Sequence, residues 1–229
     1  VNKDGVADNI QGWAKYGGTG IFVRGNRLYA SSDNDVYLYQ LNEKDEVVNP
    51  LGPKTIVKGL LAKNQHASKS ITLDGQNNIY VNIGAYSNAC QIEDRKKGSP
   101  GKMPCPILDS AGGIWKFSSK KENQVYGDGK RYATGLRNVV GLDWNTATNS
   151  LFVMQHGRDQ LNTFYPEIYS NEQNSELPAE TMYELHEGDN AGWPYVYFDP
   201  YLKKKILSPE YGGDGKKEGG ENAINPAAF

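Results

Sequence analysis

One histidine and one arginine-asparagine pair are the residues of this chain best suited to chemistry. His66 stands in "NQHASKSITL", directly before an alternating apolar run, where an imidazole can serve as a general base near neutral pH. Arg137 and Asn138 stand in "GLRNVVGLDW", where they interrupt an apolar pattern at the start of a predicted strand. We predict that this pair reaches a ligand beside the strand. The alternative for His66 is a hydrogen-bonded structural role.

The segment "MQHGRDQL" holds the residues best suited to a metal. Gly157 permits an unusual backbone conformation that leaves carbonyl oxygens free. Carbonyls followed by the Asp159 carboxylate are hard oxygen ligands of the kind that calcium takes. The alternative is an ordinary turn in which Asp159 accepts from a neighbouring amide. The other histidines are His156, at the end of a strand in this segment, and His186, which we predict to be a solvated surface residue.

The elements that position these residues form a repeat. The stretches "GNRLYASS", "QNNIYVNIG" and "TNSLFVMQHG" each have a polar turn and then alternate like a half-buried strand. A second strand follows each of them, in "DVYLYQL", "GGIWKFS" and "ETMYELHEG", and "TGIFVRG", "SKSITLDG" and "RNVVGLDW" precede them. The first pair is joined by a tight turn through Ser32, Asp33 and Asn34. Such repeats predict a β-propeller in which His66 and Arg137 begin neighbouring innermost strands at the same height.

We therefore predict an all-β fold and one domain, residues 1–229, made of four-stranded antiparallel blades. Three blades are visible and a fourth begins near "AGWPYVYFD", so we expect a fragment of about three to four blades, incomplete at the C-terminus. Long insertions at about 85–111 and 157–180 leave the same edge of the blades, where binding sites are usually built. The tail after residue 200 shows no strand period. The charge runs "EDRKKGSP" and "KKKILSPE" are predicted to be solvated loops.

Composition narrows the classes of function. The chain has 229 residues with 26 glycines, 11 prolines and 15 tyrosines, which suits many short strands joined by turns. Its formal net charge of -2 gives no basic field, so we set nucleic acid aside as a partner. No stretch approaches the ~18 apolar residues of a transmembrane segment. We find no serine elbow, P-loop or GxGxxG motif.

Two cysteines, Cys90 and Cys105, close a short polar loop in a chain with no other cysteine. We predict one disulfide and an oxidising compartment, with a pair of free thiols as the alternative. No CxxC spacing indicates zinc.

The order "HASKSITLD", "NNIYVNIG", "ATGLRNVVGLDW", "LFVMQHGRD" and "GDNAGWPYV" resembles the pyrroloquinoline quinone (PQQ)-dependent sugar dehydrogenases, including soluble aldose and glucose dehydrogenases, of six-bladed propeller fold. The L-sorbosone dehydrogenase-like branch is the most similar, and the resemblance covers about residues 18–200. Two departures from the pattern of the glucose enzymes stand out. Lys69 and Ser70 replace a glycine-arginine pair, and Arg158 replaces a proline.

The resemblance implies a role for each matched residue. His66 would be the base that removes the proton of a substrate hydroxyl while hydride passes to the quinone. Arg137 would lie beside the quinone carbonyl that gains charge, and Asn138 would bind the cofactor by a hydrogen bond. The carbonyls of Gly157 and Arg158 match the position of a Ca²⁺ ion, which polarises and orients the quinone.

Our leading hypothesis is a periplasmic or extracellular quinoprotein that oxidises a sugar or aldose-like aldehyde or alcohol with PQQ and Ca²⁺. The first alternative is a non-catalytic propeller that binds glycan or protein through its inserted loops, where the tyrosine-rich stretch "LNTFYPEIYSNEQ" could stack on sugars. A calcium-dependent lactone hydrolase is a third reading, but it would need several carboxylates that converge on the axis. The sequence does not identify the substrate or the electron acceptor.

Overall fold

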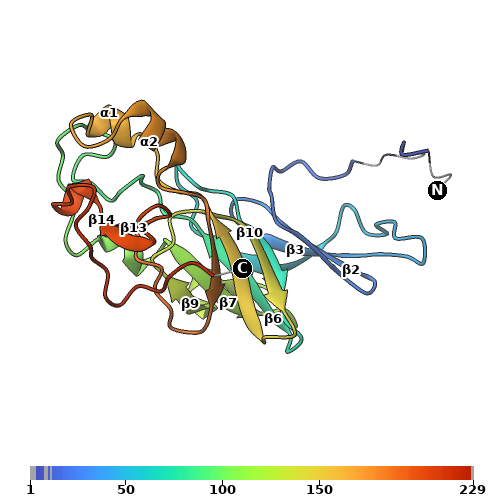
Figure 1. The fold of residues 1–229 in the computed structure, drawn as a ribbon. Helices are drawn as coiled ribbons and strands as arrows, with labels where there is room; N and C mark the ends of the chain where they lie inside the picture. Colours follow the sequence, from blue (N-terminus) through green and yellow to red (C-terminus); the bar gives the residue numbers. More distant parts are fainter. Residues whose placement is uncertain (1–3, 8–9, 11, 228–229) are drawn as a thin grey trace.

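Small antiparallel sheets follow one another along the chain in the computed structural model, which describes residues 4–7, 10 and 12–227 (Figure 1). The first sheet contains β1 (Ile21–Arg24), β2 (Arg27–Ser31), β3 (Val36–Gln40) and β4 (Lys54–Lys58). Gly25 adopts a φ of 54°, which allows the two-residue turn that pairs Arg24 with Arg27. Between β2 and β3 the Ser32 hydroxyl accepts from the amide of Asp35 at 2.9 Å. The tight turn predicted there is confirmed.

A fifth strand joins this sheet from far along the chain. The strand β8 (Gln124–Val125) pairs in parallel with β4. The Gln124 side chain is buried, and its Nε2 donates to the carbonyls of Ile56 at 3.2 Å and Ser118 at 2.7 Å. One amide group therefore holds the first sheet to the second.

The second sheet is buried on both faces. It contains β5 (Ile71–Leu73), β6 (Asn78–Ile83), β7 (Gly113–Ser118) and β9 (Lys130–Thr134). Along β6, Ile79 packs into the cluster shared with the first sheet, whereas Tyr80 packs into the cluster shared with the third. Successive side chains of a strand point to opposite faces, so a sheet between two neighbours needs apolar residues at both. Blades of a propeller cover one another in this way, and the predicted all-β propeller fold is confirmed.

The third and fourth sheets are smaller. They contain β10 (Val139–Asn145), β11 (Ser150–Gln155) and β12 (Thr181–Leu185), and then β13 (Val196–Asp199) and β14 (Lys204–Leu207). The strand β14 corrects our prediction of a tail without strands. Lys205 and Ile206 are both buried there. The buried lysine interrupts the apolar alternation, so the sequence pattern did not indicate a strand. The run "KKKILSPE" is therefore only partly solvated.

Short helices lie in the connections. They are η1 (Pro106–Asp109), η2 (Tyr126–Asp128), α1 (Leu161–Phe164), α2 (Asn171–Glu176) and η3 (Pro209–Tyr211). A capping box starts α2, in which the Ser170 hydroxyl accepts from the amide of Gln173 at 3.2 Å and the Gln173 side chain accepts from the amide of Ser170 at 2.9 Å. In Figure 1 α1 and α2 lie together on the side of β13 and β14.

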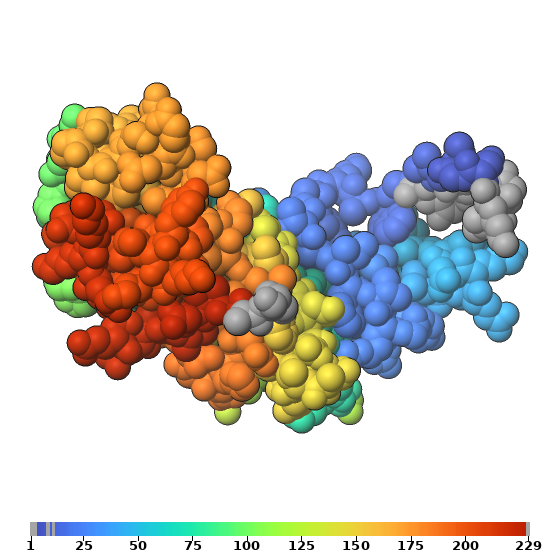
Figure 2. Space-filling model, viewed as in Figure 1, coloured from blue at the N-terminus to red at the C-terminus, as the bar shows by residue number. Residues whose placement is uncertain are grey.

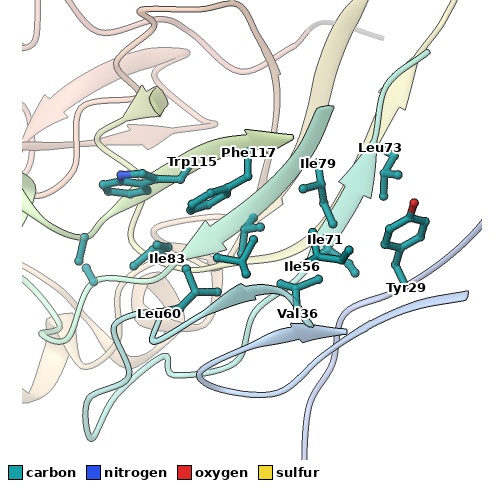
Figure 3. Close-up of a cluster of buried hydrophobic side chains, with 14 of the residues drawn as sticks. Tyr29, Val36, Ile56, Leu60, Ile71, Leu73, Ile79, Ile83, Trp115 and Phe117 are labelled. Atoms are coloured by element: carbon teal, nitrogen blue, oxygen red, sulfur yellow. The ribbon is translucent and has the colours of Figure 1, made fainter. Parts of the chain in front are cut away.

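The largest apolar core fills the space between the first and second sheets. Figure 3 shows side chains of both sheets meeting there, among them Val36, Ile56, Ile71, Leu73 and Ile79. Each of these is at most 4% exposed. This packing fixes how the strands are placed relative to one another and therefore where their polar ends meet.

The molecule is elongated, with the first sheet at one end and β13, β14 and the two α-helices at the other (Figure 2). The surface is indented between these two ends. Within the described ranges no helix combines the length and the apolar character that crossing a membrane requires.

Candidate functional site

The segments that carry the predicted site residues meet at one edge of the second and third sheets. The amide of His156, after β11, donates to the carbonyl of Asn138, before β10, at 2.9 Å. The amide of Ala85, after β6, donates to the carbonyl of Arg137 at 2.8 Å. These bonds join the segments that follow β6 and β11 to the segment before β10, and Arg137 and Asn138 lie immediately before β10 rather than inside it.

His66 is held in an unusual conformation beside this junction. Its φ of 53° is in the left-handed region, where residues other than glycine are strained. Its Nδ1 lies within hydrogen-bond distance of the Ala85 carbonyl oxygen. A carbonyl only accepts, so Nδ1 carries the hydrogen and Nε2 has the free lone pair of a base. Burial lowers the pKa of His66, and the positive charge of Arg137 lowers it further, which keeps the imidazole neutral.

A glycine allows the His66 segment to approach Asn138. A β-carbon placed on Gly84 would lie 2.6 Å from the Cβ of His66 and 3.3 Å from the Oδ1 of Asn138. No side chain fits at this distance. Gly84, at the end of "NNIYVNIG", therefore brings the candidate base and the candidate amide ligand to one place.

Arg137 is buried although it carries a charge. Its residue exposure is 3%. Its Nη1 donates to the carbonyl of Gly157 at 2.7 Å and its Nη2 donates to Oδ2 of Asp159 at 2.8 Å. Its backbone amide donates to Oε1 of Gln155 at 2.8 Å. Within the described part of the chain its Nε has no hydrogen-bond partner, so one donor of a buried cation is left for a ligand or a water.

A small cavity of about 20 Å³ lies beside Arg137 and is also lined by Gln155, Thr181 and Tyr183. A space of this size holds about one water molecule. The hydroxyl of Thr181 is buried, and no described residue is bonded to it. The volume and the unbonded hydroxyl of Thr181 both fit a water-sized occupant.

Asp159 is the exposed partner of the site. Its side chain is 51% exposed, and the same Oδ2 that binds Arg137 accepts from Nη2 of Arg95 at 3.0 Å. Burial would raise the pKa of the Asp159 carboxyl, but the two guanidiniums outweigh it and lower the pKa. Asn88 bonds to both main-chain groups of Asp159, at 2.9 Å and 3.0 Å. Two guanidiniums therefore share one carboxylate oxygen at this edge, and Asp94 adds a second carboxylate near Arg95.

The residues predicted to bind calcium are partly together. The carbonyl of Gly157 and the carboxylate of Asp159 converge on one cation, which here is the guanidinium of Arg137. These hard oxygens fit a Ca²⁺ ion if Arg137 leaves them. The carbonyl of Arg158 stays a prediction as a calcium ligand, while the side chain of Arg158 pairs with the buried Glu210. Among the residues described, no three or more His, Cys, Asp or Glu side chains group as a metal site.

The remaining sequence candidates lie outside the cluster. His156 is exposed, and its Nδ1 lies 2.8 Å from Oε2 of Glu180. His186 is exposed, as predicted, just after β12. Lys69, which departs from the glucose-enzyme pattern, is fully buried with its Nζ against the carbonyl of Ala67, and burial lowers its pKa to about 8.

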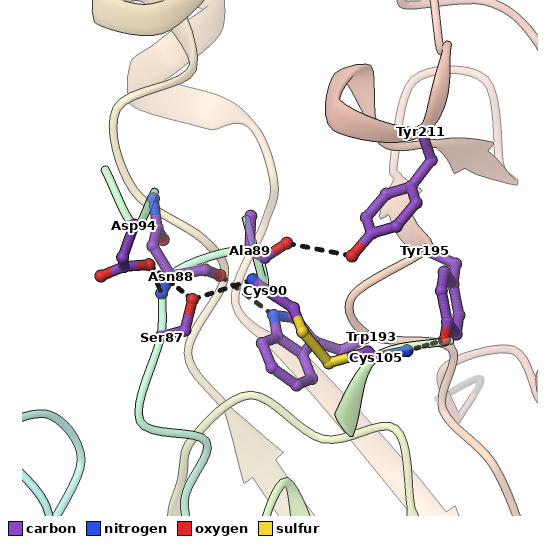
Figure 4. Close-up of a disulfide and its surroundings, with 9 residues drawn as sticks. All are labelled: Ser87, Asn88, Ala89, Cys90, Asp94, Cys105, Trp193, Tyr195 and Tyr211. Atoms are coloured by element: carbon purple, nitrogen blue, oxygen red, sulfur yellow. Dashed lines mark hydrogen bonds between the residues drawn. A yellow bond between two sulfur atoms is a disulfide. The ribbon is translucent and has the colours of Figure 1, made fainter. Parts of the chain in front are cut away.

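The predicted disulfide is present between Cys90 and Cys105, whose Cα atoms are 6.2 Å apart (Figure 4). The amide of Cys105 donates to the hydroxyl of Tyr195 at 2.7 Å. The indole Nε1 of Trp193 donates to the carbonyl of Asn88 at 3.0 Å. Side chains before β13 therefore anchor the loop that carries Asn88 into the site.

Sequence reasoning missed Arg95, Gln65 and Asn88. Arg95 stands in the charge run predicted to be solvated, yet its guanidinium bonds to Gln65, Asp159 and Gln160. The position of Gln65, directly before His66, was the one signal in the sequence for this group. We predicted that this insertion leaves the blades at the edge where binding sites are built, but no pattern indicated which of its side chains would make contacts there.

The tyrosine-rich stretch is part of a local core. Tyr169 is 2% exposed, and its hydroxyl lies 2.8 Å from that of Tyr197. Tyr165 packs against the same cluster and is half-buried. Tyr169 is therefore not on the surface for stacking on a sugar.

Comparisons with known proteins agree with this picture. A family model described as TrAA12-like matches residues 15–198. A protein of Hypocrea jecorina named pyrroloquinoline quinone-dependent sugar dehydrogenase is 23% identical over 184 residues, which covers 79% of this chain and 41% of that protein.

Solved structures share the fold. The calcium structure of the Trichoderma reesei Carbohydrate-Active Enzymes Family AA12 protein matches with a TM-score of 0.65 and 18% identity, covering 90% of this chain and 54% of the other. The holo form of the pyranose dehydrogenase PQQ domain from Coprinopsis cinerea matches with a TM-score of 0.61 and 19% identity, covering 90% and 53%. The chain thus spans about half the length of these structures and about two-fifths of the Hypocrea protein.

Proposed function

The chain belongs to the TrAA12-like family, and we propose that the protein is an oxidoreductase that uses PQQ and Ca²⁺ to oxidise a sugar or an aldose-like aldehyde or alcohol. The name of the Hypocrea relative and the fold shared with a PQQ domain support this proposal. Because the chain spans only part of these proteins, the proposal concerns the activity of the whole protein.

One observation carries the proposal: a neutral imidazole with a free Nε2 lies beside a buried arginine. His66 has its Nδ1 engaged by Ala85, and its pKa is lowered by burial and by Arg137. Oxidation of an alcohol or hemiacetal removes a proton from oxygen and a hydride from carbon. A neutral imidazole next to a fixed cation suits this separation, because the base takes the proton while the cation stabilises negative charge on the acceptor.

The role of each residue follows from its contacts. His66 accepts the hydroxyl proton at Nε2 and holds it there. Asn138, which lies on the same side of Gly84, orients the bound ligand through its amide. Arg137, which would leave Gly157 and Asp159 when these oxygens take Ca²⁺, supplies positive charge beside the bound ligand. PQQ, when bound, accepts the two electrons and the hydrogen that leave the substrate carbon.

The charge of the site fits an anionic cofactor. The guanidiniums of Arg137 and Arg95 lie at this edge, and the Nε of Arg137 has no partner among the described residues. The hard oxygens of Gly157 and Asp159 would hold Ca²⁺, which would polarise a quinone oxygen. The disulfide supports a periplasmic or extracellular location, since such bonds persist in oxidising compartments.

The test is a titration of the natural protein with PQQ, with and without Ca²⁺, followed by quinone absorbance and by dye reduction with sugars. We expect saturable, Ca²⁺-dependent binding that is lost in Arg137→Gln. We expect His66→Asn to bind PQQ but to lose dye reduction by at least about a hundredfold. The exposed imidazole of His156 provides the control, and His156→Asn should behave like the wild type.

Absence of PQQ binding by the wild-type protein would overturn the proposal. The propeller that binds glycan or protein through its loops would then be the better hypothesis. Unchanged turnover in His66→Asn would instead remove His66 as the base and leave the cofactor proposal intact.

A further inference from the structure

We propose that Arg95 is a positioning residue of the site, and that the loop closed by the disulfide belongs to the active site through it. This inference rests on the proposed function, which it deepens. Its basis is the set of contacts that Arg95 makes with the segments on either side of it.

The guanidinium of Arg95 joins the segment of His66 to the segment of Asp159. Its Nε and Nη2 lie 3.3 Å and 3.2 Å from Oε1 of Gln65, the residue before His66. Its Nη2 donates to Oδ2 of Asp159 at 3.0 Å, and its Nη1 donates to Oε1 of Gln160 at 2.5 Å. A planar fork with several fixed donors can hold these acceptors in one arrangement, which a flexible ammonium cannot do. Since these donors are engaged, Arg95 acts through its partners rather than on a ligand.

The partners of Arg95 are themselves fixed by the loop. The Nε2 of Gln65 donates to Oδ2 of Asp94 at 2.7 Å. The other oxygen of Asp94 accepts from the hydroxyl of Ser87 at 2.5 Å and from the amide of Asn88 at 3.1 Å. Figure 4 shows Ser87, Asn88 and Asp94 gathered beside the disulfide. The loop therefore presents Arg95 from a bonded framework.

Asn88 makes a second connection from the same loop to the same turn. Its amide group donates to the carbonyl of Asp159 and accepts from the amide of Asp159, at 2.9 Å and 3.0 Å. Arg95 holds the carboxylate while Asn88 holds the main chain. Both the side chain and the main chain of Asp159 are thus held in place. Because the Asp159 carboxylate accepts from Arg137, the guanidinium of Arg137 is held in place as well.

Backbone strain gathers at the residues that this network ties together. His66, Arg95 and Gln160 have φ angles of 53°, 56° and 67°, all in the left-handed region. Such conformations cost energy in residues with side chains and persist only where the surroundings hold them. The contacts of Arg95 supply that restraint at these three residues.

Arg95 also acts on the site through its charge. Its positive charge lowers the pKa of His66, as does that of Arg137, whereas Asp159 raises it. Removing Arg95 should therefore raise the pKa of His66 and favour the protonated form, which is no base. Loosening of the loop would also raise this pKa by exposing the imidazole to water, so the charge is tested by Arg95→Lys, which keeps it.

The experiment compares Arg95→Gln, Arg95→Lys and the control Lys96→Gln in the natural protein. Lys96 is on the same loop, is exposed and pairs with Glu93. We would measure kcat and KM for dye reduction, and follow the titration of the His66 imidazole by NMR in protein without PQQ. The signals of His66 are assigned by their loss in His66→Asn.

We expect Arg95→Gln to lower kcat by about tenfold to a hundredfold, the scale of a misplaced catalytic group, and to move the His66 titration to higher pH. Arg95→Lys should keep the His66 titration near that of the wild type, because the charge remains, but should still lower kcat. Lys96→Gln should change neither. If Arg95→Gln does not fold, Gln65→Leu tests the same connection from the other side and should also lower kcat.

A wild-type kcat in Arg95→Gln, with an unchanged His66 titration, would overturn the inference and make Arg95 a surface residue of the loop. Failure of the wild-type protein to bind PQQ would overturn the proposed function instead. The His66 titration in Arg95→Gln does not need PQQ, so the two failures can be told apart.

Discussion

Two arginines of this protein are equally buried, but one pairs with an exposed carboxylate and the other with a buried carboxylate. Arg137 and Arg158 each have 4% side-chain exposure and each pairs with one carboxylate. The partner of Arg137 is Asp159, 51% exposed, whereas the partner of Arg158 is Glu210, 0% exposed. Consecutive residues of one turn, Arg158 and Asp159, thus take part in two pairs of different kinds.

The difference shows how burial of the partner decides what an ion pair can do. A carboxylate in contact with water stays solvated when its guanidinium turns to another partner, so it is free to take a ligand or a metal. A carboxylate enclosed by protein cannot be separated from its arginine without leaving a buried charge. We therefore assign the Arg137 pair to the site and the Arg158 pair to the fold.

The largest effect is expected when the enclosed pair is broken. Glu210→Gln leaves Arg158 buried without a counter-charge, which should lower the free energy of unfolding by about 3–5 kcal/mol. Urea denaturation at pH 7 would measure it. The double variant Arg158→Met, Glu210→Leu should recover most of the loss. A single variant that loses less than about 1 kcal/mol would contradict the distinction between the two pairs.

Lys205 extends the comparison of the two arginine pairs, because it is a buried cation whose partners are a hydroxyl and a carbonyl. Lys205 is 5% exposed and donates to the hydroxyl of Tyr183 at 2.8 Å and to the carbonyl of Ala191 at 2.7 Å. Burial lowers the pKa of Lys205 to about 7, so between about pH 7 and 10 the unfolded chain binds more protons than the folded one. Stability should therefore rise with pH across this window.

Lys205→Met should remove that slope and raise the free energy of unfolding at pH 7 by about 1–2 kcal/mol. Part of the gain is offset because the hydroxyl of Tyr183 and the carbonyl of Ala191 lose a partner. Urea denaturation at pH 6, 7.5 and 9 would test this, with Lys204→Met as the exposed control. Equal pH slopes in wild type and Lys205→Met would refute it.

Calcium binding tests whether Arg137 occupies the position of a cation. Because its guanidinium bonds to both Gly157 and Asp159, Arg137→Gln should tighten Ca²⁺ binding by the PQQ-free protein about tenfold, or ~1.4 kcal/mol. Isothermal titration calorimetry would measure the affinity. Arg131→Gln, at an exposed arginine outside the site, is the control. Weaker or unchanged binding in Arg137→Gln would place calcium elsewhere.

The smallest effect is expected at the exposed carboxylate. Asp159→Asn should lower the free energy of unfolding by about 1 kcal/mol, because Arg137 loses the charge of Asp159 but keeps the carbonyl of Gly157 as an acceptor. The same variant should lose Ca²⁺ binding. If urea denaturation shows that Asp159→Asn loses as much stability as Glu210→Gln, the distinction between the two ion pairs is wrong.

The strands were predictable because their side chains repeat. The runs around β2, β6 and β11 alternate clearly, and each was expected together with the strands on either side of it. The strand β14 was not, because a buried lysine looks like a surface residue in a hydropathy pattern. Periodicity reports on burial of apolar groups and is blind to a buried charge that bonds to a hydroxyl and a carbonyl.

The site was predictable only where residues sit at strand ends. His66, Arg137 and Asp159 precede or follow strands, so the fold brings them together. Arg95 comes from an insertion whose course depends on Asp94, Asn88 and a disulfide. Such loops are set by individual hydrogen bonds, which leave no period in the sequence.

The strand β8 has a consequence for how the protein folds. It lies after β7 in the chain but completes the sheet of β1 to β4, and Gln124 bonds to carbonyls of both sheets. The first sheet therefore reaches its full set of strands only after β5, β6 and β7 of the second sheet have been synthesised. The amides of these two sheets should therefore be protected from hydrogen exchange as one cooperative unit. The pairing of β4 with β8 joins residues far apart in the chain, so we expect it to limit the folding rate.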